Sequence, residues 1–402
     1  MSHPKRHEIE EDELAGFKYF KKIARLLEGL HQSGCARDRA GNRELFMDQY
    51  LALLLLFMFN PICQSLRGLQ QASTLKKVQR LLGVPRSSLG SLSEAAGVFD
   101  AALLKELIGQ LADELQPVPH DARLDQVRDL ITLVDGTCLT ALPQVVRWAL
   151  YQQEQRAAKA HVEFEVLKGV PVAATITDAH ASEPAVLKSR LQAGRCYVID
   201  RGYAEYALFQ AILDAGSSFV GRLHDNAVLE ELAERPVTPE AARAGVLRDT
   251  VGRLGSKKTR DDLQVPVRVV EVACTPHRKP SGKTARGGPE QGDRLRLVTN
   301  LLDLPPEVIS AIYQARWQIE IFFRTFKHVL GCRHLLSYSA NGIALQTYAA
   351  ILACLLIALW TGRQPTLRTY EMIRFYFSGW ADADELEAHI ARLQEQPKRA
   401  TA

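Results

Sequence analysis

The first 118 residues carry the spacing of apolar side chains that is typical of amphipathic helices. Apolar residues recur every three or four positions from Phe17 to Leu30, and a second apolar run extends from Leu45 to Phe59. The segment 65–99 predicts two short helices, a Gly-Val-Pro break, and a third helix that begins near residues 91–93. The pattern therefore predicts a helical N-terminal region, residues 1–118.

From residue 129 onward the apolar period changes from helical to extended. Four short runs are rich in β-branched and aromatic residues and are bounded by turn residues, which is typical of strands. A helix is expected between the second and third runs, with Ser182 as its N-cap and Gly194 as its stop, and another follows the third run. Strands that alternate with helices predict an α/β layered fold. The predicted strands are 129–136, 169–177, 196–200 and 217–223.

Residues 224–292 break this alternation. They contain a long polar stretch and a predicted strand at 265–275, followed by a predicted mobile loop at 277–293. Strand character resumes at 294–302. A helix then opens with proline in its first turn and is predicted to run unbroken to Gly331.

Two apolar segments require a test against the length of a membrane span. The run 51–59 is too short to cross a bilayer, and Gln346 and Thr347 interrupt the start of 343–360. We therefore expect the second segment to be buried, either in the core of its own chain or between two protomers. We expect residues 348–360 and the helical tail to about residue 395 to help pair protomers, with packing on the same chain as the alternative.

Composition narrows the class of protein. The chain is 47% hydrophobic and 24% charged, which is ordinary for a globular protein. Its seven cysteines include no CxxC pair, so neither a zinc knuckle nor a disulfide scaffold is indicated, and a reducing cytosol fits best. The net charge of +4 is too small to identify a nucleic-acid partner, so the distribution of charge matters more.

One basic cluster stands out in the N-terminal region. Between Asp48 and Glu94 there is no acidic residue, whereas the segment carries several lysines and arginines. Such a helical cluster either lies on DNA phosphates or forms a solvated helix face. We take Lys76, Lys77 and Arg80 as candidate DNA contacts.

Two aspartates end apolar strands. Asp135 is followed by glycine, and Asp200 is followed by Arg-Gly-Tyr. A sheet holds a carboxylate rigidly at the mouth of a buried strand, which suits a metal ligand. Each aspartate taken alone is also consistent with a helix cap or a turn residue.

The long predicted helix carries a polar stripe. Tyr313, Arg316, Glu320 and Lys327 fall within a sector roughly 60° wide at about 100° per residue, and Arg324 joins them. These residues also form ordinary i,i+4 pairs of a solvated helix. Because the flanking residues are largely apolar, we favour a cation-lined cleft around one acid.

Four further residues have weaker signals. Asp178 and His180 fit a loop cap better than a catalytic role. Arg222 either contacts DNA or is an exposed arginine at the end of a strand. Trp317 lies at the edge of the polar stripe and is expected to pack in the core, because tryptophan is usually buried.

The stripe has the form Y-x2-R-x3-E-x6-K and reads YQARWQIEIFFRTFK. It resembles the signature of one branch of the bacterial DDE transposases, the insertion-sequence-four family. LVDGT around Asp135 and VIDRGY around Asp200 are similar to segments of that family, as are residues 219–226 and 297–335. The resemblance covers roughly residues 125–345 and is weaker in the N-terminal helices.

The resemblance implies a ribonuclease-H-like fold in which Asp135, Asp200 and Glu320 are the catalytic, metal-binding residues. These carboxylates would hold two Mg²⁺ ions about 3.5–4 Å apart, with Mn²⁺ as a substitute. One ion would polarise the attacking oxygen, and the other would stabilise the leaving oxygen. The expected DNA-binding residues are Tyr313, Arg316, Lys327, Arg324, Arg222, Lys76, Lys77 and Arg80.

The resemblance also implies a function. A DNA transposase would bind the ends of an insertion sequence, cleave the strands and join them to target DNA, as a homodimer on double-stranded DNA in the bacterial cytoplasm, associated with the nucleoid and away from membranes. Two alternatives stay open: a catalytically silent, transposase-derived DNA-binding protein, and a two-metal nuclease without strand transfer. The intact set of acids counts against the first.

The expected regions follow the family pattern of a core interrupted by a mainly β insertion. That insertion contains no Trp, Tyr or Phe. It therefore lacks the aromatic residue that, in relatives that form a DNA hairpin, stacks on a flipped base, and the cleavage route stays open. The regions are a helical DNA-binding part (1–118), a catalytic core in two parts (119–223 and 293–345), the insertion (224–292) and a helical C-terminal part (346–402).

Overall fold

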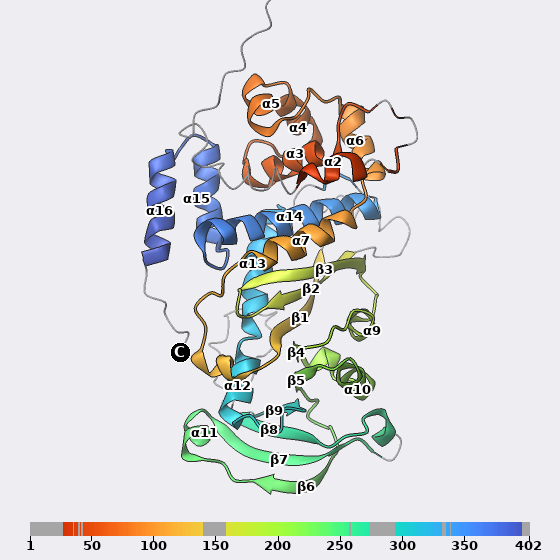
Figure 1. Ribbon diagram of the computed structural model, residues 1–402, viewed down its shortest axis with the longest axis vertical. Helices are drawn as coiled ribbons and strands as arrows, with labels where there is room; N and C mark the ends of the chain where they lie inside the picture. Colours follow the sequence, from red (N-terminus) through yellow and green to blue (C-terminus); the bar gives the residue numbers. More distant parts are fainter. Residues whose placement is uncertain are drawn as a thin grey trace, which may run out of the picture.

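The computed structural model describes residues 27–139, 158–273 and 294–395, apart from short gaps at 35, 39–40, 42, 257–258, 332–334 and 338. Within this part of the chain, a block of helices lies at one end and a nine-stranded sheet extends to the other (Figure 1). Helices α7 and α14 lie between the two (Figure 1). The predicted loop 277–293 and the apolar positions before residue 27 fall outside the described residues.

The N-terminal block is helical throughout its described residues, with serine caps at two helix starts. The Ser65 hydroxyl accepts from the Gly68 amide and the Ser88 hydroxyl from the Ser91 amide, at 3.1 and 3.0 Å. Because Ser88 is the cap, the helix expected near 91–93 begins earlier, at Leu89. The helices are α2 (Leu30–Ser33), α3 (Met47–Phe59), α4 (Leu66–Ser73), α5 (Lys76–Leu82), α6 (Leu89–Val98) and α7 (Leu103–Asp113).

Five strands form the half of the sheet nearest these helices, in the order β3-β2-β1-β4-β5. The first three strands pair antiparallel, whereas β4 and β5 run parallel to β1. Strand β2 was not predicted, although charged and apolar residues alternate along it. Its glutamates are in fact buried, and Glu163 pairs with Arg190 at 3.0 Å. The strands are β1 (Leu130–Leu139), β2 (Ala158–Glu165), β3 (Val170–Asp178), β4 (Arg195–Ile199) and β5 (Ser218–Arg222).

Four antiparallel strands continue the same sheet beyond β5, in the order β9-β8-β7-β6. A buried ion pair joins two of them: Arg268 contacts Asp249 at 2.6 Å, and both side chains are almost completely inaccessible to solvent. The described residues between β5 and β9 are thus mainly strand. The elements are β6 (Leu229–Arg235), α11 (Pro239–Arg243), β7 (Val246–Leu254), η4 (Arg260–Asp262), β8 (Val267–Ala273) and β9 (Arg294–Thr299).

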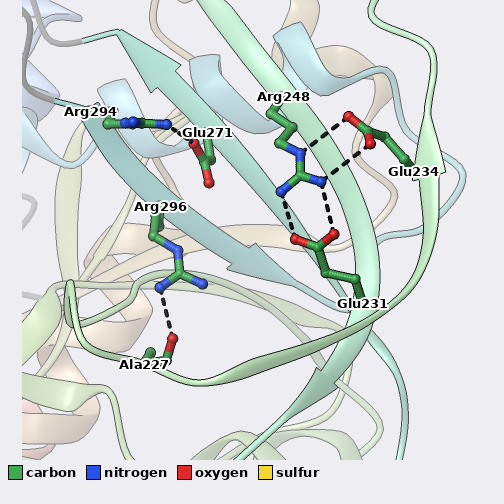
Figure 2. Close-up of polar contacts among 7 residues, drawn as sticks. All are labelled: Ala227, Glu231, Glu234, Arg248, Glu271, Arg294 and Arg296. Carbon is green, nitrogen blue, oxygen red and sulfur yellow. Dashed lines mark hydrogen bonds and ion pairs between the residues drawn. The ribbon is translucent and has the colours of Figure 1, made fainter.

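Charged pairs cover one face of this extension. Figure 2 shows Arg248 between Glu231 and Glu234, with nitrogen–oxygen distances from 2.6 to 3.2 Å. Arg294 pairs with Glu271 at 3.0 Å in the same view. Because carboxylates hold these two arginines, we do not assign them to phosphate binding.

Helices cover both faces of the sheet. Helix α10 (Tyr206–Asp214) packs on β5 and α9 (Glu183–Lys188) on β1, while α12 (Pro306–Gln314) and α13 (Trp317–Leu330) pack on the other face. Helix α9 ends six residues before Gly194, so the predicted stop is wrong. Two short 3₁₀ turns are η2 (Ala122–Gln126) and η3 (Arg201–Tyr203).

The helix predicted to run unbroken to Gly331 is in fact two helices. At the junction, the amides of Arg316 and Ile319 bond to carbonyls three residues earlier, Tyr313 and Arg316. These tighter bonds interrupt the regular i→i−4 ladder. The predicted stripe assumed about 100° per residue along one continuous helix. Across this junction that assumption does not give the relative positions of side chains on α12 and α13.

The most apolar helix, α14 (Ala340–Thr361), is a core helix of this chain. It is long and apolar enough to cross a membrane, but 83% of its most apolar window is buried inside the protein. It packs on α7, α13, α3 and β3. The expectation that residues 348–360 help pair protomers is therefore wrong, and packing on the same chain is correct. Helices α15 (Leu367–Phe377) and α16 (Ala383–Glu395) follow.

Candidate active site

Asp135 lies inside strand β1, four residues before its last residue, so the prediction that it ends the strand is wrong; it is largely buried. Its Oδ1 accepts a hydrogen bond from the Gly136 amide at 2.7 Å. Burial raises the pKa of Asp135 to about 6. The Gly136 amide and Arg316 oppose this rise, whereas the charges of Glu183 and Asp200 add to it. Asp135 is therefore a carboxylate that lacks sufficient positive charge around it.

Asp200 follows the parallel neighbour β4, so both aspartates lie at the same edge of the sheet. Its Oδ1 accepts from the Arg201 amide at 2.8 Å and from the Tyr313 hydroxyl at 3.0 Å. Burial alone would raise the pKa of Asp200, but Arg316 and these hydrogen bonds outweigh it and lower the pKa. The two aspartates thus have opposite electrostatic environments.

Arg316 connects the sheet with the helices. Its Nη2 lies 2.7 Å from Oε1 of Glu320, and its Nη1 lies 4.0 Å from Oδ2 of Asp200. The guanidinium is also close to the rings of Tyr313 and Trp317, at 5.9 and 5.8 Å. The structure therefore brings together four of the predicted site residues. Asp200, Tyr313 and Glu320 surround the fourth, the Arg316 cation.

The environment of Arg316 decides between the two interpretations of the polar stripe. Its side chain is only 13% exposed. Burial opposes the charge of Arg316, but Asp200, Tyr313 and Glu320 outweigh it and raise its pKa. The Arg316–Glu320 pair is thus part of a partly buried charged cluster, not an ordinary pair on a solvated helix.

Tyr313 is nearly buried, and its hydroxyl is a donor in this cluster. Burial and the Asp200 charge raise the pKa of Tyr313, so the phenol stays neutral at physiological pH. Its proton therefore points toward the Asp200 carboxylate. The same hydroxyl can serve a phosphate oxygen only by sharing or leaving that bond.

Arg222 also faces the cluster, from the end of β5. Its charge lowers the pKa of Asp200 and of Tyr313. Its Nε is buried and has no hydrogen-bond partner among the described residues. The view of Arg222 as an exposed strand-end residue is therefore wrong, and an acceptor such as a phosphate oxygen would satisfy the buried N–H.

Trp317 does not pack in the core as expected. Its side chain is 45% exposed, and Ile321, one turn later, is 46% exposed. Both flank Glu320 on α13. The smaller expectation for Asp178 is confirmed, since its Oδ1 caps the turn by accepting from the His180 amide at 2.8 Å.

The other predicted DNA contacts lie away from the carboxylates. Lys327 is seven residues beyond Glu320, about 10 Å farther along α13, and Arg324 is exposed between them. Lys76, Lys77 and Arg80 are exposed on α5, on the far side of α14 and α7 from the sheet (Figure 1). A bound DNA segment would have to extend well beyond the acids to reach α5.

Sequence reasoning missed a further carboxylate beside Asp135. Glu183, the first residue of α9, forms an ion pair with Lys159 of β2 at 2.8 Å. The only signal was indirect, because Ser182 marks a helix start and acidic residues are common in a first turn. Since β2 itself was not predicted, nothing in the sequence placed Lys159 near the site.

The three predicted acids have the right chemistry for a divalent metal. Carboxylate oxygens are the ligands that Mg²⁺ prefers, and a bound cation would offset the cost of burying Asp135. In the arrangement of the described residues, however, no three acidic, histidine or cysteine side chains form a metal-binding group. The Arg316 guanidinium supplies the positive charge shared by Asp200 and Glu320.

Comparison with known proteins places this cluster in a family context. Residues 127–356 match the family described as "Transposase DDE domain". The match covers more than half of the chain and contains Asp135, Asp200 and the Tyr313–Lys327 segment.

Two relatives cover most of the chain. The chain is 30% identical over 270 residues to "Putative transposase y4zB" of Sinorhizobium fredii, across 67% of this chain and 70% of that protein. It is 25% identical over 321 residues to "Probable transposase for insertion sequence element IS5377" of Geobacillus stearothermophilus, across 78% and 80%.

One solved structure aligns over most of the length. The cryo-electron-microscopy structure of a piggyBac transposase synaptic complex with hairpin DNA aligns with 98% of this chain and 87% of its own. The TM-score is 0.41 and the sequence identity is 10%.

Proposed function

The chain belongs to the transposase DDE domain family and is a DDE-type transposase, and on this premise we propose that it binds the ends of an insertion sequence, cleaves the strands there and joins them to target DNA. The observation that carries the proposal is the cluster in which Arg316 lies between Asp200 and Glu320, beside Asp135. Acids from the interior of β1, from the end of β4 and from helix α13 converge there around a single cation.

We assign the chain to the Tyr-Arg-Glu-Lys branch of the insertion-sequence-four family. Three of the four signature residues, Tyr313, Arg316 and Glu320, lie in the Asp200 cluster, which supports the assignment. We also propose a ribonuclease-H-like core. The order β3-β2-β1-β4-β5, with three antiparallel strands followed by two parallel ones, supports that fold.

The family generally uses divalent metal ions, and we propose that Asp135, Asp200 and Glu320 hold Mg²⁺, with Mn²⁺ as a substitute. The metal would polarise the attacking oxygen and stabilise the leaving oxygen of a phosphoryl transfer. Arg316 would then be available to hold a phosphate oxygen bidentately. The unpaired Nε–H of Arg222 and the Tyr313 hydroxyl would fix a neighbouring phosphate.

The rest of the DNA would follow cations outside the cluster. We propose that Arg324 and Lys327 contact the transposon end beyond the scissile phosphate, and that Lys76, Lys77 and Arg80 contact a more distant segment. Two protomers would hold two ends as a homodimer in a paired-end complex. We propose that this takes place in the bacterial cytoplasm, on nucleoid DNA.

Cleavage and binding measured on the same variants test this function. Duplexes that carry the inverted repeats flanking the coding region would be incubated with the wild type and with Asp135→Asn, Asp200→Asn and Glu320→Gln. We expect each variant to retain end binding and to lose cleavage in Mg²⁺. Wild-type binding without cleavage would favour a silent DNA-binding protein, and cleavage by all three variants would remove the acids from the mechanism.

A further inference from the structure

Glu183 reaches the backbone beside both catalytic aspartates. A Cβ atom at position 136, directly after Asp135, would lie only 2.6 Å from Oε1 of Glu183. A Cβ atom at position 202, two residues after Asp200, would lie 4.0 Å from its Oε2. One carboxylate therefore spans the two chain segments that carry Asp135 and Asp200, and glycine at 136 leaves room for it.

The Glu183 carboxylate is held by Lys159, whose side chain also lies beside Gly136. Their charged atoms are 2.8 Å apart, and the side chains of Lys159 and Glu183 are only 16% and 23% exposed. An ion pair shielded to this degree has a fixed geometry and is costly to leave half-formed. Glu183 is therefore a fixed negative charge next to Asp135.

Two buried polar side chains, Tyr203 and His161, lie beside Glu183. A cavity of about 10 Å³, close to the size needed for one water molecule, is lined by Glu183, Tyr203 and His161 among others. Tyr203 and His161 are 1% and 3% exposed, and Tyr203 Oη and His161 Nδ1 have no hydrogen-bond partner among the described residues.

The hydrogen bonds of His161 decide whether its unpaired nitrogen, Nδ1, is a donor or an acceptor. The Thr177 hydroxyl donates to the Asp178 carbonyl, so it accepts from Nε2 of His161, at 2.8 Å. Burial lowers the pKa of His161, which favours the neutral ring, and Nδ1 is then an acceptor.

We propose that Glu183 is a positioning residue of the catalytic centre. Its side chain lies against the backbone after Asp135 and after Asp200 and keeps these two segments in place. It also adds a fourth negative charge, which favours a divalent cation between the two aspartates. Tyr203 and His161 line the same small cavity as Glu183. This inference rests on the proposed metal-dependent function. Mutation of a residue that orients metal ligands without binding the metal itself typically lowers metal affinity by about 10-fold to 100-fold.

The test is Mn²⁺ binding to the full-length protein, followed by electron paramagnetic resonance of free Mn²⁺ and by the Mn²⁺-induced rise in melting temperature. We expect Glu183→Gln to weaken binding by about 10-fold to 100-fold. Glu240→Gln is the matched control, because Glu240 also lies in the first turn of a short helix after a threonine cap and a proline, but is exposed on α11. It should bind Mn²⁺ as the wild type does.

Two further variants separate a role toward the metal from a purely structural ion pair. Gly136→Ala would displace the Glu183 carboxylate without removing its charge, and should also weaken Mn²⁺ binding. Lys159→Gln removes a competing cation and should leave the affinity unchanged or raise it. Because Lys159→Gln also frees the Glu183 carboxylate that Lys159 holds, it should in no case weaken binding as much as Glu183→Gln; if the two variants weaken binding equally, the pair is structural and the inference is overturned.

Asp135→Asn distinguishes failure of this inference from failure of the proposed function. Loss of Mn²⁺ binding in Asp135→Asn with wild-type binding in Glu183→Gln would overturn the role of Glu183 alone. A wild type that binds no Mn²⁺, or an Asp135→Asn variant that binds it normally, would overturn the proposed metal site and the role of Glu183 together.

Discussion

Neutralising the two catalytic aspartates should change the stability of the metal-free protein in opposite directions. The pKa of Asp135 is raised to about 6 by burial, from 3.8, so its ionised form destabilises the folded state. A shift of this size corresponds to about 3 kcal/mol. The pKa of Asp200 is lowered, because Arg316 and Tyr313 stabilise its ionised form. Asp135→Asn should therefore raise the free energy of unfolding at pH 7.5, whereas Asp200→Asn should reduce it.

The pH dependence follows from proton linkage. Below pH 6 the folded state takes up a proton at Asp135 that the unfolded chain takes up only near pH 3.8. The cost of the charge is complete above pH 6 and disappears as the pH falls toward 3.8. The stabilisation in Asp135→Asn should thus approach about 3 kcal/mol at pH 7.5 and be much smaller at pH 4.5.

Urea denaturation of the full-length protein in EDTA, followed by far-ultraviolet circular dichroism at pH 7.5 and 4.5, measures these changes. The exposed control Glu240→Gln should have the wild-type midpoint at both pH values. Equal destabilisation by Asp135→Asn and Asp200→Asn at pH 7.5 would refute the reasoning. It would mean that the two carboxylates share one electrostatic environment.

Three further results are expected. Arg316→Ala should slow single-turnover cleavage of pre-bound DNA. Arg316→Lys should not restore the rate fully, because lysine lacks the bidentate fork. A wild-type cleavage rate in Arg316→Ala would mean that Arg316 contributes to DNA binding only. Neutralising Lys76, Lys77 and Arg80 together should reduce the slope of log affinity against log salt concentration by about 0.9 for each phosphate contact that is lost. An unchanged slope would mean that α5 is a solvated face that does not contact DNA. Leu355→Ala, in the buried centre of α14, should lower the free energy of unfolding by about 2–5 kcal/mol without changing the oligomeric state measured by light scattering.

The sequence predicted those parts of the site that depend on local order. Asp135 and Asp200 follow runs of mostly apolar, β-branched residues, so both strands were visible in the sequence. The end predicted at Asp135 is wrong, because β1 continues to Leu139. The spacing of Tyr313, Arg316 and Glu320 placed them on one side of a helix, and the tighter turn at the junction keeps them together even though it divides that helix.

What the sequence could not predict depends on contacts between distant segments. The burial of the β2 glutamates could not be predicted, because it depends on partners such as Arg190, which is 27 residues beyond Glu163. The omission of β2 also hid Lys159 and therefore the position of Glu183. Helix α14 is apolar on all sides, and composition alone could not distinguish a core helix from an interface between protomers.

The predicted burial of Trp317 was wrong for a related reason. Tryptophan is usually buried, but the face of α13 beside Glu320 is left uncovered by the sheet and the other helices, and Ile321 is exposed with it. Arg222 differs in the other direction: a charged residue at a strand end is usually solvated, yet here it faces Asp200.

The joining of a pre-cleaved end to a target tests the central claim most directly. A duplex that carries the element's inverted repeat and a free 3′-hydroxyl would be incubated with supercoiled plasmid, Mg²⁺ and either the wild type or Glu320→Gln. We predict that the wild type produces plasmid covalently joined to the duplex and that Glu320→Gln, although it still binds the duplex, produces none. Joining by Glu320→Gln at the wild-type rate, or wild-type protein that nicks DNA without ever joining it, would contradict the account.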